Sequence, residues 1–195
     1  MENAPFQVPV NAIVTTDKCF IRPYNVSDAA SLSAAANDPE IARFMRNKFP
    51  SPYTLDDAHF FINLSSERTP CVNYAIFLLD GTYAGGIGFI PGGDTEFRTW
   101  EVGYWIGKNQ WGKGVTTSAV KGFCKWAFTA FPEILRIEAG VYEGNFGSMK
   151  VLERAGFLRE GVRRKAVVKS GKAFDVTVFG LLREDVEGSN RDEQA

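Results

Sequence analysis

The chain has 195 residues, with 22 Lys and Arg against 23 Asp and Glu, and a formal net charge of −1. This length suits one domain with a real core, and a near-neutral chain lacks the global basic field that favours nucleic acid. Three scattered cysteines, without a CxxC spacing or a Cys/His cluster, predict reduced thiols, a cytoplasmic location and no metal. The sequence shows no signal-peptide pattern. It also contains no apolar run of the ~20 residues that a membrane-spanning segment needs.

The first part of the chain predicts one strand followed by short helices. Residues 1–16 show no clear periodicity and are taken as an N-terminal extension, and a strand follows at 19–24. Three helix-start signals come next: Asn25 or Ser27 before 29–36, Asp38-Pro39 before a helix ending near 46, and Thr54 before a helix to about 66.

The pattern then becomes one of strands interrupted by two helices. Strands are predicted at 73–79, 83–90 and 99–106, then a helix from 115 to about 131, a strand at 135–142, a helix at 145–155, and strands near 157–168 and 173–182. Three glycines at 85, 86 and 88 indicate that another part of the protein packs closely there. We expect a single domain over 17–183, a charged tail over 184–195, and a mixed α/β (α+β) sheet.

The segment Gln110–Ala119, QWGKGVTTSA, is the most informative feature of the sequence. Gly112 and Gly114 flank Lys113, and the residues that follow have the period of an amphipathic helix. A glycine loop that leads into a helix presents backbone N–H groups and the positive end of the helix dipole to an anion. The loop therefore predicts a phosphate site, although glycines also occur in ordinary turns before helices.

Three segments in this order resemble the GNAT superfamily of N-acetyltransferases, and in particular its ribosomal-protein N-acetyltransferase branch. They are Trp100–Ile106 (WEVGYWI), Trp111–Ala119 (WGKGVTTSA) and Asn145–Phe157 (NFGSMKVLERAGF). The resemblance covers about residues 19–182. It implies a mixed, mostly antiparallel sheet of about seven strands, flanked by helices and splayed where acetyl-CoA binds.

By this resemblance acetyl-CoA is the co-substrate, and its pyrophosphate is the anion of the glycine loop. The residues implied in binding it are Tyr104, Trp105, Ile106, Gly112, Lys113, Gly114, Val115, Thr116, Asn145 and Ser148. Asn109 departs from the family pattern, which has a longer Gln or Arg at this position. The backbone cradle needs no side chain, so we expect it to survive this change, with Lys113 either contacting a phosphate or lying in solvent.

Direct attack of an amine on a thioester needs a base and a donor to the leaving thiolate. Glu101 is the candidate base because it stands in an otherwise apolar strand, where a carboxylate is costly without a role or a partner. A structural ion pair or a solvent-facing position is the alternative. Ser148 is the candidate donor, with Tyr142 and Tyr104 as other possibilities. His59, the only histidine, lies far from these motifs.

The acceptor amine is the least determined part of the interpretation. We expect the N-terminal amine of a protein or peptide, because the segments 29–66 and 157–182 carry aromatic residues and few acids. The alternatives are a small amine (a polyamine, an amino acid or an antibiotic) and a CoA-binding module without catalysis. We expect no nucleic-acid partner, and a monomer or a homodimer.

Overall fold

The structure is a computed structural model, and it describes residues 6–186. Its eight strands belong to one sheet, in the order β1-β2-β3-β4-β5-β6-β8-β7. Strand β5 pairs with β6 in parallel, whereas the pairs β1–β2, β2–β3, β3–β4, β6–β8 and β7–β8 are antiparallel. The predicted mixed α/β fold with a mostly antiparallel sheet is therefore confirmed, with eight strands where about seven were expected.

Two compact units make up the chain, and each is built from two separate stretches of sequence. The first unit holds residues up to 88 together with 104–122, and the second holds 89–103 together with the residues from 123 onward. Strands β4 (Tyr83–Pro91) and β5 (Thr99–Ile106) and helix α4 (Val115–Ala130) each contribute residues to both. The units are described separately below.

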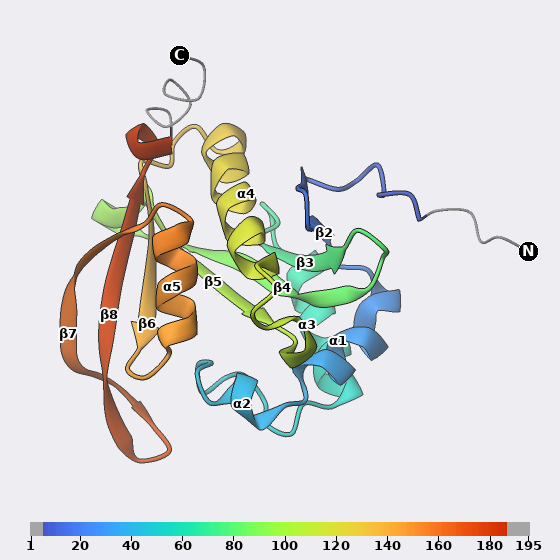
Figure 1. Ribbon diagram of the computed structural model, residues 1–195, viewed down its shortest axis with the longest axis horizontal. Helices are drawn as coiled ribbons and strands as arrows, with labels where there is room; N and C mark the ends of the chain where they lie inside the picture. Colours follow the sequence, from blue (N-terminus) through green and yellow to red (C-terminus); the bar gives the residue numbers. More distant parts are fainter. Residues whose placement is uncertain (1–5, 187–195) are drawn as a thin grey trace, which may run out of the picture. The chain divides into compact units, whose positions relative to one another are not determined.

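The first unit contains a short antiparallel sheet and the helices that the chain forms before β3 (Figure 1). Its elements are β1 (Val14–Thr15), β2 (Cys19–Pro23), α1 (Ala29–Ala36), α2 (Pro39–Ala42), α3 (Leu55–Ser66) and β3 (Asn73–Leu78). Helices α1 and α3 lie against each other. Their buried residues form one apolar cluster that includes Leu32, Ala58 and Ile62.

The helix starts of the first unit follow from local side-chain caps. Thr54 accepts a hydrogen bond from the Asp57 backbone N–H at 3.2 Å, and the Asp57 carboxylate accepts one from the Thr54 N–H at 2.8 Å. Asp38 caps α2 by accepting from the Glu40 N–H at 2.8 Å. Both caps satisfy N–H groups that a helix start leaves without partners. Both predicted starts are confirmed, although α2 ends at Ala42 rather than near residue 46.

Strand β1 corrects the expectation for residues 1–16. Val14 pairs with Ile21 and Thr15 with Phe20, so the chain before β2 already belongs to the sheet. Residues 1–5 of this stretch lie outside the described part of the chain. Two residues are too few to show a period-two pattern, so sequence periodicity could not reveal this strand.

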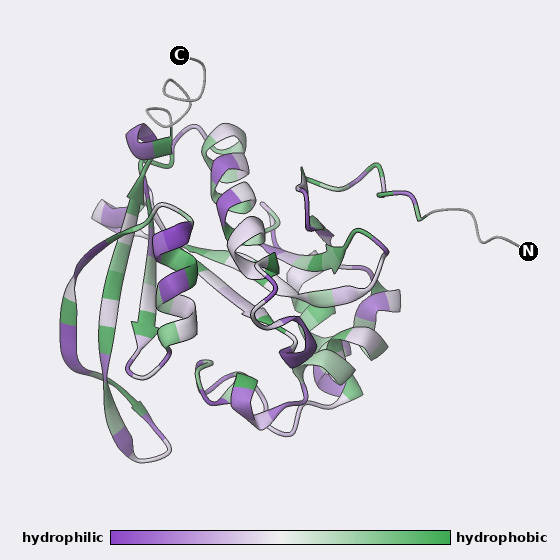
Figure 2. Cartoon of the chain, in the orientation of Figure 1, coloured by the Kyte–Doolittle hydropathy of each residue, from purple (hydrophilic) through white to green (hydrophobic). Residues whose placement is uncertain are grey.

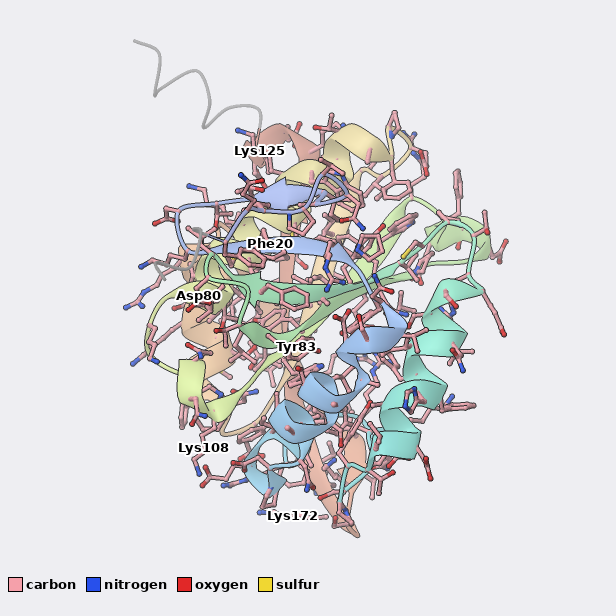
Figure 3. The ribbon with its side chains drawn as sticks, turned by 90° about the vertical axis from the view of Figure 1, so that its right-hand side faces the viewer. Phe20, Asp80, Tyr83, Lys108, Lys125 and Lys172 are labelled. Carbon is pink, nitrogen blue, oxygen red and sulfur yellow. The ribbon has the colours of Figure 1, made fainter. Side chains whose placement is uncertain are left out.

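Aromatic rings line one end of the first unit. Phe20 stacks on Phe77 at 5.3 Å between ring centroids, and Phe77 meets Tyr83 edge-on at 5.3 Å. Phe20 and Tyr83 are labelled in Figure 3, on β2 and at the start of β4. Other aromatic side chains pack against the glycines of β4, because a side chain on Gly86 would collide with the Tyr24 hydroxyl and the Trp105 ring. The predicted close packing at these glycines is confirmed.

The second unit is built on the remaining strands and on the C-terminal half of α4. Strand β6 (Arg136–Tyr142) pairs along its whole length with β8 (Lys172–Leu182), which also pairs with β7 (Leu158–Lys169), and α5 spans Phe146–Arg154. Phe89, Trp100, Phe123 and Phe131 form its aromatic core. Figure 2 shows the hydrophilic stretch along β7, which is exposed over most of its length.

Strands β5 and β6 pair only at their beginnings. Thr99, Trp100 and Glu101 pair with Arg136, Ile137 and Glu138, and the pairing ends there although β5 continues to Ile106 and β6 to Tyr142. Within the described chain the two parallel strands therefore part after Glu101. This divergence agrees with the splayed sheet that the resemblance of the sequence implies.

Candidate functional site

The glycine loop lies between β5 and α4 and is fixed at its start by one side chain. A short 3-10 helix, η3 (Lys108–Gln110), follows β5, and the Trp111 indole N–H donates to the Ile106 carbonyl at 3.0 Å. Gly112 and Gly114 then adopt φ values of +75° and +78°. Residues other than glycine rarely adopt such positive φ values, so both glycines are needed for the path of the loop.

Backbone amides gather at the start of α4. The first α-helical hydrogen bond runs from the Ser118 N–H to the Gly114 carbonyl at 3.1 Å. The N–H groups of Val115, Thr116 and Thr117 have no acceptor within the helix and none elsewhere in the described chain. Together with the helix dipole they favour an anion. The start of α4 can therefore attract an anion, and the phosphate site that the sequence predicts at this loop stays a prediction.

Two lysines next to the loop differ in how their charges are used. Lys108 (labelled in Figure 3) pairs with Glu40 at 2.6 Å and lies 3.8 Å from the Asp38 carboxylate, and the hydrogen bond that its ammonium donates to Glu40 raises the pKa of Lys108. Lys113 is exposed, and its ammonium donates only a long hydrogen bond, 3.4 Å, to the Gln110 side-chain oxygen. Lys113 is therefore the more available of the two charges. Asn109 is exposed.

The three predicted cofactor residues at the end of β5 belong to the first unit. Tyr104 and Trp105 are half-buried and Ile106 is buried. The Trp105 ring lies 6.0 Å from the Phe49 ring and 6.2 Å from the Tyr83 ring. A side chain on Gly85 would collide with the Trp105 carbonyl oxygen, so the backbone of β4 approaches β5 closely here.

Glu101 faces another carboxylate across the sheet. Its Cα partner on β6 is Glu138, and registered neighbours on adjacent strands project to the same face. The Glu138 carboxylate accepts from the Arg136 guanidinium at 3.3 Å, and the same guanidinium holds Glu160 in a two-pronged pair. Arg136 lowers the pKa of Glu160 through these hydrogen bonds.

Asn145 and Ser148 lie together at the start of α5. The Asn145 side-chain oxygen accepts a hydrogen bond from the Ser148 backbone N–H at 3.2 Å, which makes Asn145 the N-cap of the helix. The Asn145 N–H in turn donates to the Tyr142 carbonyl at 3.0 Å. The N-cap geometry is a structural role for Asn145 that the sequence interpretation did not consider.

The structure groups the predicted site residues by unit. Tyr104, Trp105 and Ile106 lie with the glycine loop and the start of α4 in the first unit, and Glu101, Asn145 and Ser148 lie in the second. Sequence reasoning missed Lys18, whose side chain lies beside Gly114. No pattern in the sequence could reveal this neighbour, because the two residues are far apart along the chain and Lys18 stands in a turn.

Comparison with known proteins identifies the class of protein. Residues 18–158 match the family model described as an acetyltransferase (GNAT) domain. An uncharacterized N-acetyltransferase, p20 of Bacillus licheniformis, is 29% identical over 174 residues, which cover 89% of this chain and 97% of that protein. The putative ribosomal N-acetyltransferase YdaF of Bacillus subtilis is 36% identical over 111 residues, which cover 57% of this chain and 60% of that protein.

Solved structures share the fold. The Mycobacterium smegmatis RimJ in complex with CoA-disulfide has a TM-score of 0.75 at 21% identity, covering 89% of this chain and 90% of that one. The ribosomal L7/L12 alpha-N-protein acetyltransferase RimL has a TM-score of 0.76 at 16% identity, covering 88% and 97%. The microcin C7 self-immunity acetyltransferase MccE, in complex with acetyl-CoA and AMP, has a TM-score of 0.72 at 24% identity, covering 86% and 93%.

The chain therefore belongs to the GNAT acetyltransferase family. It is an acetyl-CoA N-acetyltransferase, and the sheet described above is the GNAT fold. Among residues 6–186, no helix is long and apolar enough to cross a membrane. The same residues contain no group of three or more His, Cys, Asp or Glu side chains arranged to hold a metal ion.

Proposed function

We propose that this acetyltransferase transfers the acetyl group of acetyl-CoA to the N-terminal amine of a protein or peptide. The observation that carries the binding half of the proposal is the glycine loop, with positive φ at Gly112 and Gly114 and acceptor-free amides from Val115 to Thr117. These amides and Lys113 would hold the pyrophosphate of CoA, and the end of β5 would lie along its pantetheine arm. Backbone N–H groups would donate to the pyrophosphate oxygens, so this binding needs no long side chain in place of Asn109.

The reaction needs one proton acceptor and one proton donor besides the two substrates. The free amine attacks the carbonyl carbon of the thioester, a C–N bond forms, the C–S bond breaks, and the CoA sulfur takes up a proton. Glu101 accepts the proton that the ammonium must lose, directly or through water. Ser148 donates to the sulfur, since a hydroxyl can both give and accept a proton.

The position of Glu101 supports its role as the base. It is the residue after which β5 and β6 part, so it stands where the sheet opens rather than inside a continuous ladder. Tyr142, at the end of β6 shortly before α5, is the alternative to Ser148 as the proton donor to the CoA sulfur.

Aromatic residues of the first unit favour an acceptor with an apolar group near its amine. The rings of Phe49 and Tyr83 lie next to that of Trp105, and Phe49 in turn lies 5.0 Å from Tyr53 between ring centroids. The first side chain of a peptide, or the body of a small amine, could contact these rings.

The acids of the segment before β3 argue against a polyamine acceptor. Asp28 pairs with Arg22, Asp57 caps α3, and Glu40 pairs with Lys108. The hydrogen bonds from Thr54 lower the pKa of Asp57, as expected of a capping carboxylate. A polycation would need several uncommitted carboxylates, and these three of the segment's acids are already engaged, whereas Asp56 is exposed in the first turn of α3. One relative, named as a putative ribosomal N-acetyltransferase, adds support for a protein acceptor.

The decisive experiment measures CoA thiol release with a panel of peptides that differ in their first residue and a matched panel of polyamines, amino acids and aminoglycosides. We expect peptides with a free N-terminus to give the highest kcat/KM and the same peptides with a blocked N-terminus to give none. Faster turnover of any small amine than of every peptide would overturn the proposed acceptor. A peptide acetylated only on lysine would do the same.

Variants test the residues separately. Glu101→Gln is expected to lower kcat/KM by about 100-fold while CoA affinity stays unchanged, the size usual for loss of a general base. Glu153→Gln, at an exposed position on α5, is the control. Full activity of Glu101→Gln refutes its role as the base, and full activity of both Ser148→Ala and Tyr142→Phe refutes both as donors.

The phosphate cradle is tested by a different pair of variants. Gly114→Ala should weaken CoA binding, whereas Gly93→Ala, at φ −124° with open space around it, should not.

A further inference from the structure

We propose that Lys18, in the turn between β1 and β2, binds a phosphate group of CoA beside the glycine loop. The inference rests on the proposed function in one respect, that this loop holds the phosphates of CoA. It adds a residue that lies outside every motif of the sequence and is contributed by the chain before the first predicted strand. Lys18 is a binding residue rather than a catalytic one.

The side chain of Lys18 lies against the residue that opens α4. A Cβ placed on Gly114 would be 3.4 Å from Lys18 Cε, 3.7 Å from its Cδ and 3.9 Å from its Nζ. The Lys18 ammonium therefore stands next to the same helix start whose N–H groups lack acceptors. An anion held by those amides would lie within reach of a flexible side chain that needs only a rotamer change to contact it.

Packing of the turn on α4 fixes the Lys18 backbone at this place. Gly114, Ser118 and Gly122 are four residues apart and share one face of the helix. The Ser118 hydroxyl donates to the Asp17 carboxylate at 3.0 Å, and a Cβ on Gly122 would lie 2.8 Å from Val14 Cγ1. The turn thus follows the helix face closely, which requires small residues there and directs the turn toward the loop.

The turn is also fixed internally. Thr16 Oγ1 accepts hydrogen bonds from the backbone N–H groups of Lys18, at 3.2 Å, and Cys19, at 3.1 Å. These bonds hold the Lys18 Cα while its side chain stays exposed. A cation on a fixed backbone loses less freedom on binding than one on a mobile terminus, so more of the contact energy appears as affinity.

The Lys18 charge is available for a ligand. In the part of the chain from 6 to 186, Lys18 forms no ion pair, while the neighbouring Asp17 carboxylate accepts from Ser118. Lys108, the other lysine near the loop on the β5 side, is paired with Glu40. CoA carries a pyrophosphate and a 3′-phosphate. The helix dipole together with Lys113 compensates only part of that negative charge. Lys18 supplies a second cation without disrupting an existing pair.

Calorimetric titration of the full chain with CoA tests the inference. Lys18→Ala is expected to raise the Kd for CoA by about fivefold to tenfold, in keeping with one exposed charge-assisted contact, and to flatten its salt dependence. Lys18→Arg should bind within twofold of the unchanged protein. Lys121→Ala is the matched control, since it removes an exposed lysine farther along α4. Circular dichroism melting confirms that each variant is folded.

A second titration with 3′-dephospho-CoA identifies the phosphate. If the effect of Lys18→Ala disappears with this ligand, Lys18 contacts the 3′-phosphate, and if it persists, Lys18 contacts the pyrophosphate. Equal Kd values for Lys18→Ala and the unchanged protein at low ionic strength overturn the inference while the loop remains a CoA site. Failure of the unchanged protein to bind CoA would instead refute the proposed function itself.

Discussion

The Arg183 guanidinium donates a hydrogen bond to the Phe128 carbonyl oxygen at 2.6 Å. The same side chain donates to the Ile134 carbonyl from Nε at 3.1 Å and from Nη2 at 2.7 Å, and to the carbonyls of Phe131 and Pro132. Its position after β8 brings one planar cation onto the last turn of α4 and the loop that follows. Arg183 thus satisfies carbonyl groups that a helix end leaves without N–H partners.

Replacing Arg183 should destabilise the second unit. Arg183→Met keeps much of the apolar stem but leaves several carbonyls without a charged donor, so we expect the free energy of unfolding to fall by about 2–3 kcal/mol. Urea unfolding followed by tryptophan fluorescence measures the change. Arg154→Met, at the exposed end of α5, should change it by less than about 0.5 kcal/mol. Equal stabilities of the two variants would show that the cap contributes nothing.

The Arg22–Asp28 pair predicts a larger loss in the first unit. Its two bonds are 2.7 and 2.8 Å long, and the side chains are only 13% and 7% exposed. Asp28 also accepts from the Asn25 N–H at 2.7 Å, and the Arg22 guanidinium lies 4.2 Å over the Phe77 ring. Asp28→Asn would leave Arg22 buried without its anion, which should cost about 3 kcal/mol or more.

Thermal and urea unfolding of Asp28→Asn test this value, with Asp56→Asn as the control because Asp56 is exposed in the first turn of α3. The double variant Arg22→Met, Asp28→Asn should recover part of the loss, since no buried charge then lacks a partner. This explanation is contradicted if the double variant loses more free energy of unfolding than Arg22→Met and Asp28→Asn lose together.

Sequence patterns recovered most of the elements because each carried a local signal. Thr54 with Asp57, and Asp38 followed by Pro39, mark helix starts by their own side chains, and the hydrophobic period of α4 is long enough to be unambiguous. The three glycines of β4 correctly indicated close packing. Strand β1 was missed because two residues carry no period, and its stability comes from pairing with β2.

The candidate site divides in the same way. The glycine loop could be recognised because its glycines stand close together in the sequence, and the structure gives both Gly112 and Gly114 a positive φ. The environment of Glu101 could not, because its neighbours Glu138, Arg136 and Glu160 come from strands whose register no local pattern specifies. The position of Lys18 could be predicted even less, since its place beside Gly114 depends on how a turn packs against a helix.

Asn145 combines a structural role with its proposed ligand role, and two substitutions can separate them. Asn145→Ala removes the cap of α5 and should lower the free energy of unfolding by about 1 kcal/mol. Asn145→Ser keeps a capping oxygen, so its stability should stay within about 0.5 kcal/mol of the unchanged protein. Urea unfolding and CoA titration are measured on both variants.

If Asn145 contacts CoA, both variants should bind CoA more weakly, although only the alanine variant is destabilised. Unchanged CoA affinity in Asn145→Ser together with weakened affinity in Asn145→Ala would assign the residue to the cap alone. Gly147→Ala, on the same exposed first turn but without a capping side chain, provides the control for changes in helix propensity.

Buried tyrosines of the first unit predict a loss of stability at alkaline pH. Burial raises the pKa of Tyr53 from 10.0 to about 12, and burial also raises the pKa values of Tyr24 and Tyr83, whose hydroxyls lie 3.5 Å apart. A tyrosine whose folded-state pKa is raised contributes stability that is complete below pH 10.0, the unfolded value, and is lost as pH rises through the folded value. The free energy of unfolding should therefore fall between about pH 10 and 12.

Urea unfolding at a series of alkaline pH values compares the unchanged protein with Tyr53→Phe. The phenylalanine variant cannot ionise at this position, so its stability should decline less steeply, by up to about 1 kcal/mol at pH ~11. Below about pH 9 the two proteins should differ by a constant amount, because the hydroxyl is then neutral in both states. Parallel curves throughout the alkaline range would show that Tyr53 ionises as readily in the folded protein as in the unfolded chain.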